Sequence, residues 1–149
     1  MALSRAWAAL PLRLIVGYGF MEHGWAKLAR GPEHFTAILA ALHVPLPQLL
    51  SWGTIAVEIF GGLAVLLGLF VEWAAIPMIA VLLTAIVTVH LPNGFSSIKL
   101  LSVDAAGAHF GQPGYETDLL YLAAIAALWL AGPGPAALNR RIRKPAPGA

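Results

Sequence analysis

Six ionisable side chains lie within or beside long apolar stretches of this 149-residue sequence. They are Glu22, His23, Lys27, Glu58, His90 and Glu116. Carboxylates and imidazoles can exchange protons with a bound molecule, and lysine and histidine can donate hydrogen bonds to its oxygen atoms. Because ionisable groups are costly in an apolar environment, those that occur there often mark functional sites. We therefore predict these six residues as substrate-binding candidates and assign no catalytic residue.

Glu58 is the most unusual of the six, because it is the one polar side chain in AVEIFGGLAVLLGL, residues 56–69. Gly61 and Gly62 follow it by about one helical turn, and glycines at this spacing let a second backbone approach closely. We therefore expect the acid to face a neighbouring helix. Two interpretations stay open. Glu58 exchanges protons with a bound molecule, or it is a protonated structural acid that is hydrogen-bonded to Thr54 or to another helix.

The composition is typical of an integral membrane protein. Hydrophobic residues make up 59% of the chain, charged residues make up 11%, and the mean hydropathy is +0.78, whereas soluble domains carry about 25% charged residues. The absence of cysteine from the sequence excludes disulfides, thiol catalysis and iron–sulfur centres. No basic patch with interleaved aromatic residues indicates a nucleic-acid partner. The lipid bilayer is therefore the expected partner.

Four apolar segments carry or flank the six residues. They cover residues 6–28, 50–70, 73–91 and 118–132. Their lengths and composition indicate membrane spans. Between the first two, residues 31–48 have apolar positions at helical spacing but are too few to span, which predicts a short amphipathic helix on the outer surface. The expected fold is therefore all-α, a transmembrane four-helix bundle, with a loop at 92–117 long enough to fold back over its mouth.

Basic residues gather toward the two ends of the chain, and they set the expected orientation. The residues concerned are Arg5, Arg13, Arg140, Arg141, Arg143 and Lys144. By the positive-inside rule, we expect a multi-pass protein with both termini in the cytoplasm. We divide the chain into a four-helix membrane domain, residues 1–139, and a basic, disordered cytoplasmic tail, residues 140–149.

This orientation gathers the ionisable residues in the outer half of the bundle. At about 1.5 Å per residue, Glu22 and His23 lie about 8–9 Å below the outer end of the first segment, and Glu58 lies about 12 Å below the outer end of the second. His90 and Glu116 fall near the outer mouth. We therefore expect one polar pocket in the outer half.

Alternative roles for these residues stay open at this point. Glu22 and Lys27 can form an ion pair at the interface, or Lys27 can extend outward to water. His23 and His90 can serve as axial haem ligands, and together with Glu22 and Glu58 they can bind a divalent metal. The spacing supports neither arrangement, and we predict no metal site. His90 can also cap its helix.

Several short motifs follow one another along the chain. The first segment contains Arg13, Gly17, Phe20, Gly24 and Lys27, the second contains Glu58-Ile-Phe-Gly61-Gly62 and Leu66-Leu67-Gly68-Leu69, and the later motifs are His90 with Gly94-Phe95, Gly114-Tyr115-Glu116 and Gly132-Pro133-Gly134. In this order and with these gaps, the set resembles the DoxX family over about residues 10–139.

The resemblance implies a small four-helix protein of the bacterial inner membrane, related to subunits of a quinol oxidase and of a thiosulfate:quinone oxidoreductase. It suggests a membrane subunit of a redox system that binds a quinone or a similar lipophilic molecule in the polar pocket, with electrons from a partner oxidoreductase. The alternative is a non-catalytic scaffold or assembly factor for such a partner. A small transporter fits less well, because no inverted repeat is apparent. Whether the chain is itself an enzyme or forms homo-oligomers stays open.

Overall fold

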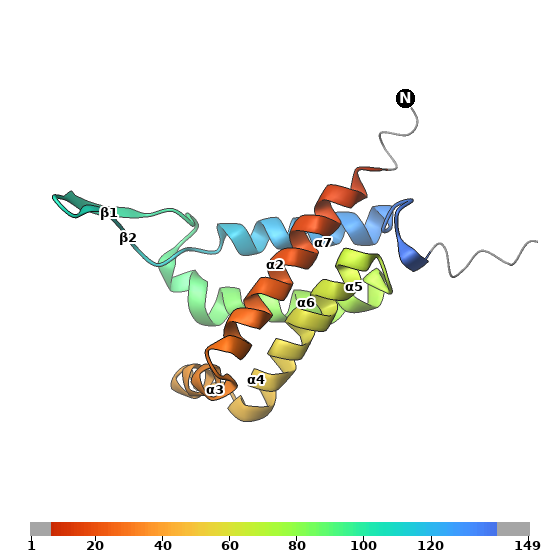
Figure 1. The fold of residues 1–149 in the computed structure, drawn as a ribbon. Helices are drawn as coiled ribbons and strands as arrows, with labels where there is room; N and C mark the ends of the chain where they lie inside the picture. The colour runs from red at the N-terminus through yellow and green to blue at the C-terminus, as the bar shows by residue number, and fades with distance from the viewer. Residues whose placement is uncertain (1–6, 140–149) are drawn as a thin grey trace, which may run out of the picture.

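The computed structural model describes residues 7–139, which are mostly helical (Figure 1). The elements are α2 (Ala9–Ala29), α3 (Pro32–Ala41), α4 (Pro47–Ala56), the π-helix η1 (Val57–Gly61), α5 (Gly62–Leu67), α6 (Val71–Ala85), the π-helix η2 (Ile86–His90), the 3-10 helix η3 (Leu91–Asn93), β1 (Leu100–Asp104), β2 (Gly107–Phe110) and α7 (Glu116–Ala131). Elements α4 to α5 form one helical stretch, Pro47–Leu67, and α6 to η3 form another, Val71–Asn93. Within the described residues, these two stretches are long and apolar enough to cross a membrane. The predicted tail at 140–149 lies outside the described residues.

Each of the predicted apolar segments forms a helix, and proline and glycine set the ends of the second one. Pro47 begins this segment before its predicted start, because the fixed backbone angle of proline suits the first turn of a helix. Gly68 ends it before the predicted end, because its φ of 69° is the left-handed conformation that glycine adopts after a helix. The first and fourth segments are α2 and α7.

A short helix lies between the first two segments, as predicted for residues 31–48. This helix, α3, begins at Pro32, after Gly31 with a φ of 95°. Two hydroxyl groups hold its first turn, because Thr36 Oγ1 and Ser51 Oγ donate hydrogen bonds to the carbonyl oxygen of Pro32 at 2.9 and 3.0 Å. Ser51 belongs to α4 and is fully buried. Its hydrogen bond therefore fixes α3 against α4.

The long helices pack through small residues and a shared apolar core. α2 packs against α5, η1 and α7, while α6 packs against α7 and η1 (Figure 1). A Cβ added to Gly17 would lie 2.7 Å from the carbonyl oxygen of Gly62, and one added to Gly62 would lie 2.7 Å from that of Gly17. The backbones of α2 and α5 therefore touch, which confirms the close approach predicted from Gly62. The core around them includes Val16, Val65, Met78, Ile125 and Leu128.

The prediction of an all-α fold is wrong for the loop at 92–117, which contains an antiparallel hairpin. β1 pairs with β2, with Ser102 opposite His109. Gly107 has a φ of 122°, which lets the chain reverse at the tip. Hydrogen bonds from His109 and from the Ala106 amide hold the pKa of Asp104 below its ordinary value. Figure 1 shows the hairpin extending away from the helices rather than folding back over them.

Candidate functional site

Lys27 and Glu58 form an ion pair where α2 meets η1. Lys27 Nζ lies 2.7 Å from both carboxylate oxygens of Glu58, and the two side chains are 22% and 6% exposed. Gly24 permits this contact, because a Cβ added there would lie 3.0 Å from the Cβ of Glu58. Phe35 of α3 adds a cation–π contact, with its ring centroid 5.0 Å from Lys27 Nζ. The buried carboxylate is therefore paired with a charge.

This ion pair decides between the alternatives left open for Lys27 and Glu58, since Glu58 is bonded to a neighbouring helix. Lys27 contacts Glu58 of η1 and not Glu22 of its own helix, because residues five apart on a helix point in different directions. Glu22 is exposed. Glu58 accepts its hydrogen bonds from Lys27 rather than from Thr54, since a cation is the stronger donor for a buried carboxylate.

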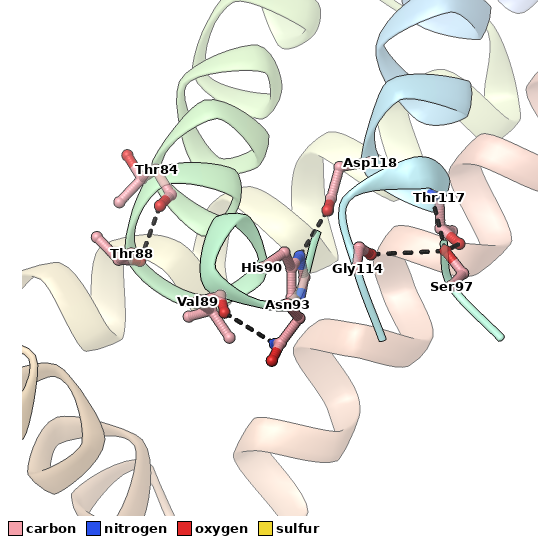
Figure 2. A network of polar contacts seen from close by, with 9 residues as sticks. All are labelled: Thr84, Thr88, Val89, His90, Asn93, Ser97, Gly114, Thr117 and Asp118. Carbon is pink, nitrogen blue, oxygen red and sulfur yellow. Dashed lines mark hydrogen bonds and ion pairs between the residues drawn. The ribbon is translucent and has the colours of Figure 1, made fainter. Parts of the chain in front are cut away.

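A second pair, His90 and Asp118, joins η2 to α7 (Figure 2). His90 Nδ1 lies 2.5 Å from Asp118 Oδ2, and Asp118 is 7% exposed. The contact engages one ring nitrogen and leaves Nε2 as the second polar atom, which accepts or donates a hydrogen bond according to its protonation. Asp118 lies in the first turn of α7, where the helix dipole favours a carboxylate. Asp118 therefore orients the His90 ring.

Sequence reasoning left Asp118 out of the candidate set. An acid at the start of an apolar helix is ordinary, because carboxylates are favoured there whatever the function. One feature of the sequence could have identified Asp118 as a candidate. It lies near the same predicted outer mouth as His90, whose imidazole ring needs a hydrogen-bond partner. The contact of Phe35 with Lys27 had no sequence signal beyond the apolar face of its helix.

Both pairs border one cavity of about 690 Å³. Its wall is formed by residues of α2, α3, α4, η1, α6, η2 and α7 and by the end of the loop before α7. The acidic, basic and histidine side chains in this wall are His23, Lys27, Glu58, His90 and Asp118. Most of the remaining wall is apolar or carries hydroxyl groups. The structure thus gathers four of the six predicted residues around one cavity.

The other two predicted residues, Glu22 and Glu116, lie outside the cavity wall. Glu116 Oε2 accepts a hydrogen bond from the Ser97 amide at 3.0 Å. Ser97 Oγ also lies 2.8 Å from Thr117 Oγ1 and accepts from the Thr117 amide at 3.1 Å (Figure 2). Glu116 therefore fastens the loop after η3 to the first turn of α7, and supports the helix that carries Asp118.

Each π-helix carries one ionisable residue of the cavity. Glu58 lies within η1, and His90 is the last residue of η2. π-helical turns are rare and occur frequently at functional sites. Two such turns at one cavity are therefore independent support for a functional role of this region.

The metal alternative built on Glu22, His23, Glu58 and His90 finds no support in the geometry. Among residues 7–139, no group of three or more His, Cys, Asp or Glu side chains is arranged to hold a metal ion. Glu58 and His90 are instead each held by another side chain, Lys27 in one case and Asp118 in the other.

The fold and the cavity define a small, mostly helical protein with two helical stretches that could cross a membrane and with paired ionisable side chains in a largely apolar cavity. The chain belongs to the DoxX family, as its motifs predicted, and the family model DoxX matches residues 8–91. The chain is 32% identical over 145 residues to an uncharacterized membrane protein of Mycobacterium tuberculosis, an alignment that covers 92% of this chain and 82% of that protein. No solved structure matches it.

Proposed function

We propose that this chain is an integral membrane subunit of a redox system that binds a quinone, or a similar lipophilic molecule, in the cavity. The observation that carries the proposal is the presence of two ionisable pairs, Lys27 with Glu58 and His90 with Asp118, in a largely apolar wall. A quinone has an apolar body and carbonyl oxygens that accept hydrogen bonds. The cavity volume of about 690 Å³ lies in the range of small-molecule sites.

The residues of the wall fit such a molecule. Lys27 Nζ and His90 Nε2 can donate hydrogen bonds to its oxygens, while Glu58 and Asp118 hold these donors in place. A bound quinone supplies electron and proton transfer, with electrons from a partner oxidoreductase. His23, on the same face of α2 as Lys27, adds a further group that can hold or release a proton at the cavity wall.

The proposal includes four membrane crossings in the bacterial inner membrane, by α2, by the two stretches Pro47–Leu67 and Val71–Asn93, and by α7. An even number of crossings requires the start of the first helix and the end of the last to lie on one side. The hydrogen bond from Arg13 Nη1 to the carbonyl oxygen of Pro133, at 3.1 Å, supports this arrangement because it joins those two regions. Both termini are then cytoplasmic by the positive-inside rule.

Purified wild-type protein should retain a quinone that mass spectrometry of a solvent extract identifies, and Glu58→Gln should retain about tenfold less. The substitution removes a charge that holds Lys27, and hydrogen bonds to charged groups contribute about 1.5–3 kcal/mol, where 1.4 kcal/mol is about tenfold in affinity. Glu22→Gln is the matched control, because Glu22 lies outside the cavity wall. A wild-type extract without quinone, or an equal loss in Glu22→Gln, would contradict the proposal.

A second candidate function, a scaffold for a partner oxidoreductase, is favoured by the hairpin. Leu101, Val103 and Phe110 are 70%, 68% and 61% exposed on a segment that extends beyond the helices. Large apolar side chains exposed together often mark a protein interface.

If the hairpin binds the partner, replacing residues 100–110 by a short Gly-Ser linker should remove an oxidoreductase that co-purifies with the wild type. The ligand retained in the cavity should stay unchanged, because these residues do not line it. The partner is detected by its own activity and by mass spectrometry. Undiminished co-purification would remove the hairpin from consideration.

A further inference from the structure

The cavity opens sideways between α4 and α6. Both helices contribute to its wall, but α6 packs closely against η1, α5 and α7, whereas α4 is not among its close neighbours. The two helical stretches therefore diverge beyond η1, and in Figure 1 the green end of the stretch that begins with α6 points away from α4. The wall residues Gly53 on α4 and Pro77, Ala80 and Thr84 on α6 are exposed along this opening.

The side chains that line the opening are small and largely apolar. Thr84 Oγ1 donates to the carbonyl oxygen of Ala80 at 2.9 Å, and Thr88 Oγ1 donates to that of Thr84 at 2.8 Å (Figure 2). Both hydroxyl hydrogens are thus used within the helix itself. The ionisable residues of the wall come from α2, η1, η2 and α7 instead. The cavity therefore has charged groups on one side and a side that suits a hydrocarbon chain.

With the four membrane crossings proposed above, the opening faces the lipid. It lies between Pro47–Leu67 and Val71–Asn93, the two helical stretches that are apolar and long enough to cross a membrane. Large apolar side chains that are exposed on these two stretches include Leu49, Ile76 and Leu83. A molecule dissolved in the bilayer can therefore reach the ionisable pairs through this opening without passing through water.

We propose that the cleft between α4 and α6, lined by Gly53, Ala80 and Thr84, holds the hydrocarbon tail of the bound molecule and is its route of access from the bilayer. This inference rests on the proposed function and narrows its ligand class to head groups that carry a long isoprenoid or alkyl chain. The head group lies at the ionisable pairs, and the tail leaves between the two helices toward lipid.

Gly53 gives a clean test, because a Cβ added there meets no atom within 4 Å. The first atom of a side chain at Gly53 therefore has room, and we expect the ring of Gly53→Phe to extend into the cleft that Gly53 lines. Ala56→Phe is the matched control on the same helix, since Ala56 is exposed but lies outside the cavity wall. Two probes are compared in detergent by quenching of tryptophan fluorescence: a methoxylated para-benzoquinone without a side chain, and the same ring with a decyl chain.

We expect Gly53→Phe to weaken binding of the decyl quinone about tenfold. The introduced phenyl ring would occupy the cleft, so the decyl chain could enter only by overpacking it. Binding of the ring alone should stay within about twofold of wild type, and Ala56→Phe should change neither. Equal effects on both probes, or none, would overturn the inference while the proposed function stands. Failure of the wild type to bind either probe would overturn both. If Gly53→Phe does not fold, Ala80→Phe fills the same cleft from the facing helix and carries the same expectation.

Discussion

Replacing Lys27 by methionine should lower the stability of the folded protein by about 3–5 kcal/mol, the range for removing one partner of a buried ion pair. The substitution leaves the Glu58 carboxylate, which is 6% exposed, without the ammonium group that contacts both of its oxygens at 2.7 Å. The cation–π contact with Phe35 is lost as well. The measurement is the thermal unfolding of the purified variant and the wild type in the same detergent.

The double variant Lys27→Met/Glu58→Gln separates the ion pair from the packing around it. It should recover much of the lost stability, because a neutral amide is far less costly to bury than an unpaired carboxylate. Lys99→Met is the control for losing a lysine outside this site, since Lys99 lies in the loop before β1. If the double variant were as unstable as Lys27→Met alone, the shape of Lys27 and not its charge would be what the fold requires.

The helices could be predicted from the sequence because their signals are local. Apolar runs of sufficient length give the segments, and residues such as Pro47 and Gly68 set the ends. The hairpin could not be predicted in this way. Its first strand has two adjacent leucines, Leu100 and Leu101, and a register irregularity between Leu100 and Ser102. These features interrupt the alternation that marks a strand, so the segment had the pattern of a loop.

The site could be predicted only in part, because contacts between helices depend on how each helix is rotated. Ionisable residues in apolar segments selected His23, Lys27, Glu58 and His90, and all four line the cavity. The contact of Lys27 with Glu58 differs from both alternatives predicted for Lys27, which were an ion pair with Glu22 and extension to water. The rotation of α2 that turns it toward Glu58 is set by glycine contacts such as that of Gly17 with α5, and these require three dimensions.

Arg13→Met should be the second strongly destabilising substitution, for a reason that no sequence pattern reveals. The Arg13 side chain is held by backbone groups, because its guanidinium donates to the carbonyl oxygens of Val65, Leu66 and Pro133 at 3.0, 2.7 and 3.1 Å. Val65 and Leu66 belong to the last turn of α5, where the Val65 carbonyl oxygen also accepts a hydrogen bond from the Gly68 amide at 3.0 Å. The carbonyl oxygens of Leu66 and Pro133 lose this donor in the variant. Because a buried acceptor left unpaired costs about 1–3 kcal/mol, we expect a total loss of about 2 kcal/mol or more in thermal unfolding.

Arg13→Lys tests whether the fork of the guanidinium or only its charge stabilises this end of the molecule. Lysine keeps the positive charge that the end of α5 favours, but one ammonium group cannot reproduce the planar set of donors that spans α5 and the segment after α7. We therefore expect stability in the order wild type, Arg13→Lys, Arg13→Met. Arg30→Met, which removes an exposed arginine just after the other end of α2, should change little. A lysine variant as stable as the wild type would show that charge alone joins the start of α2 to the ends of α5 and α7.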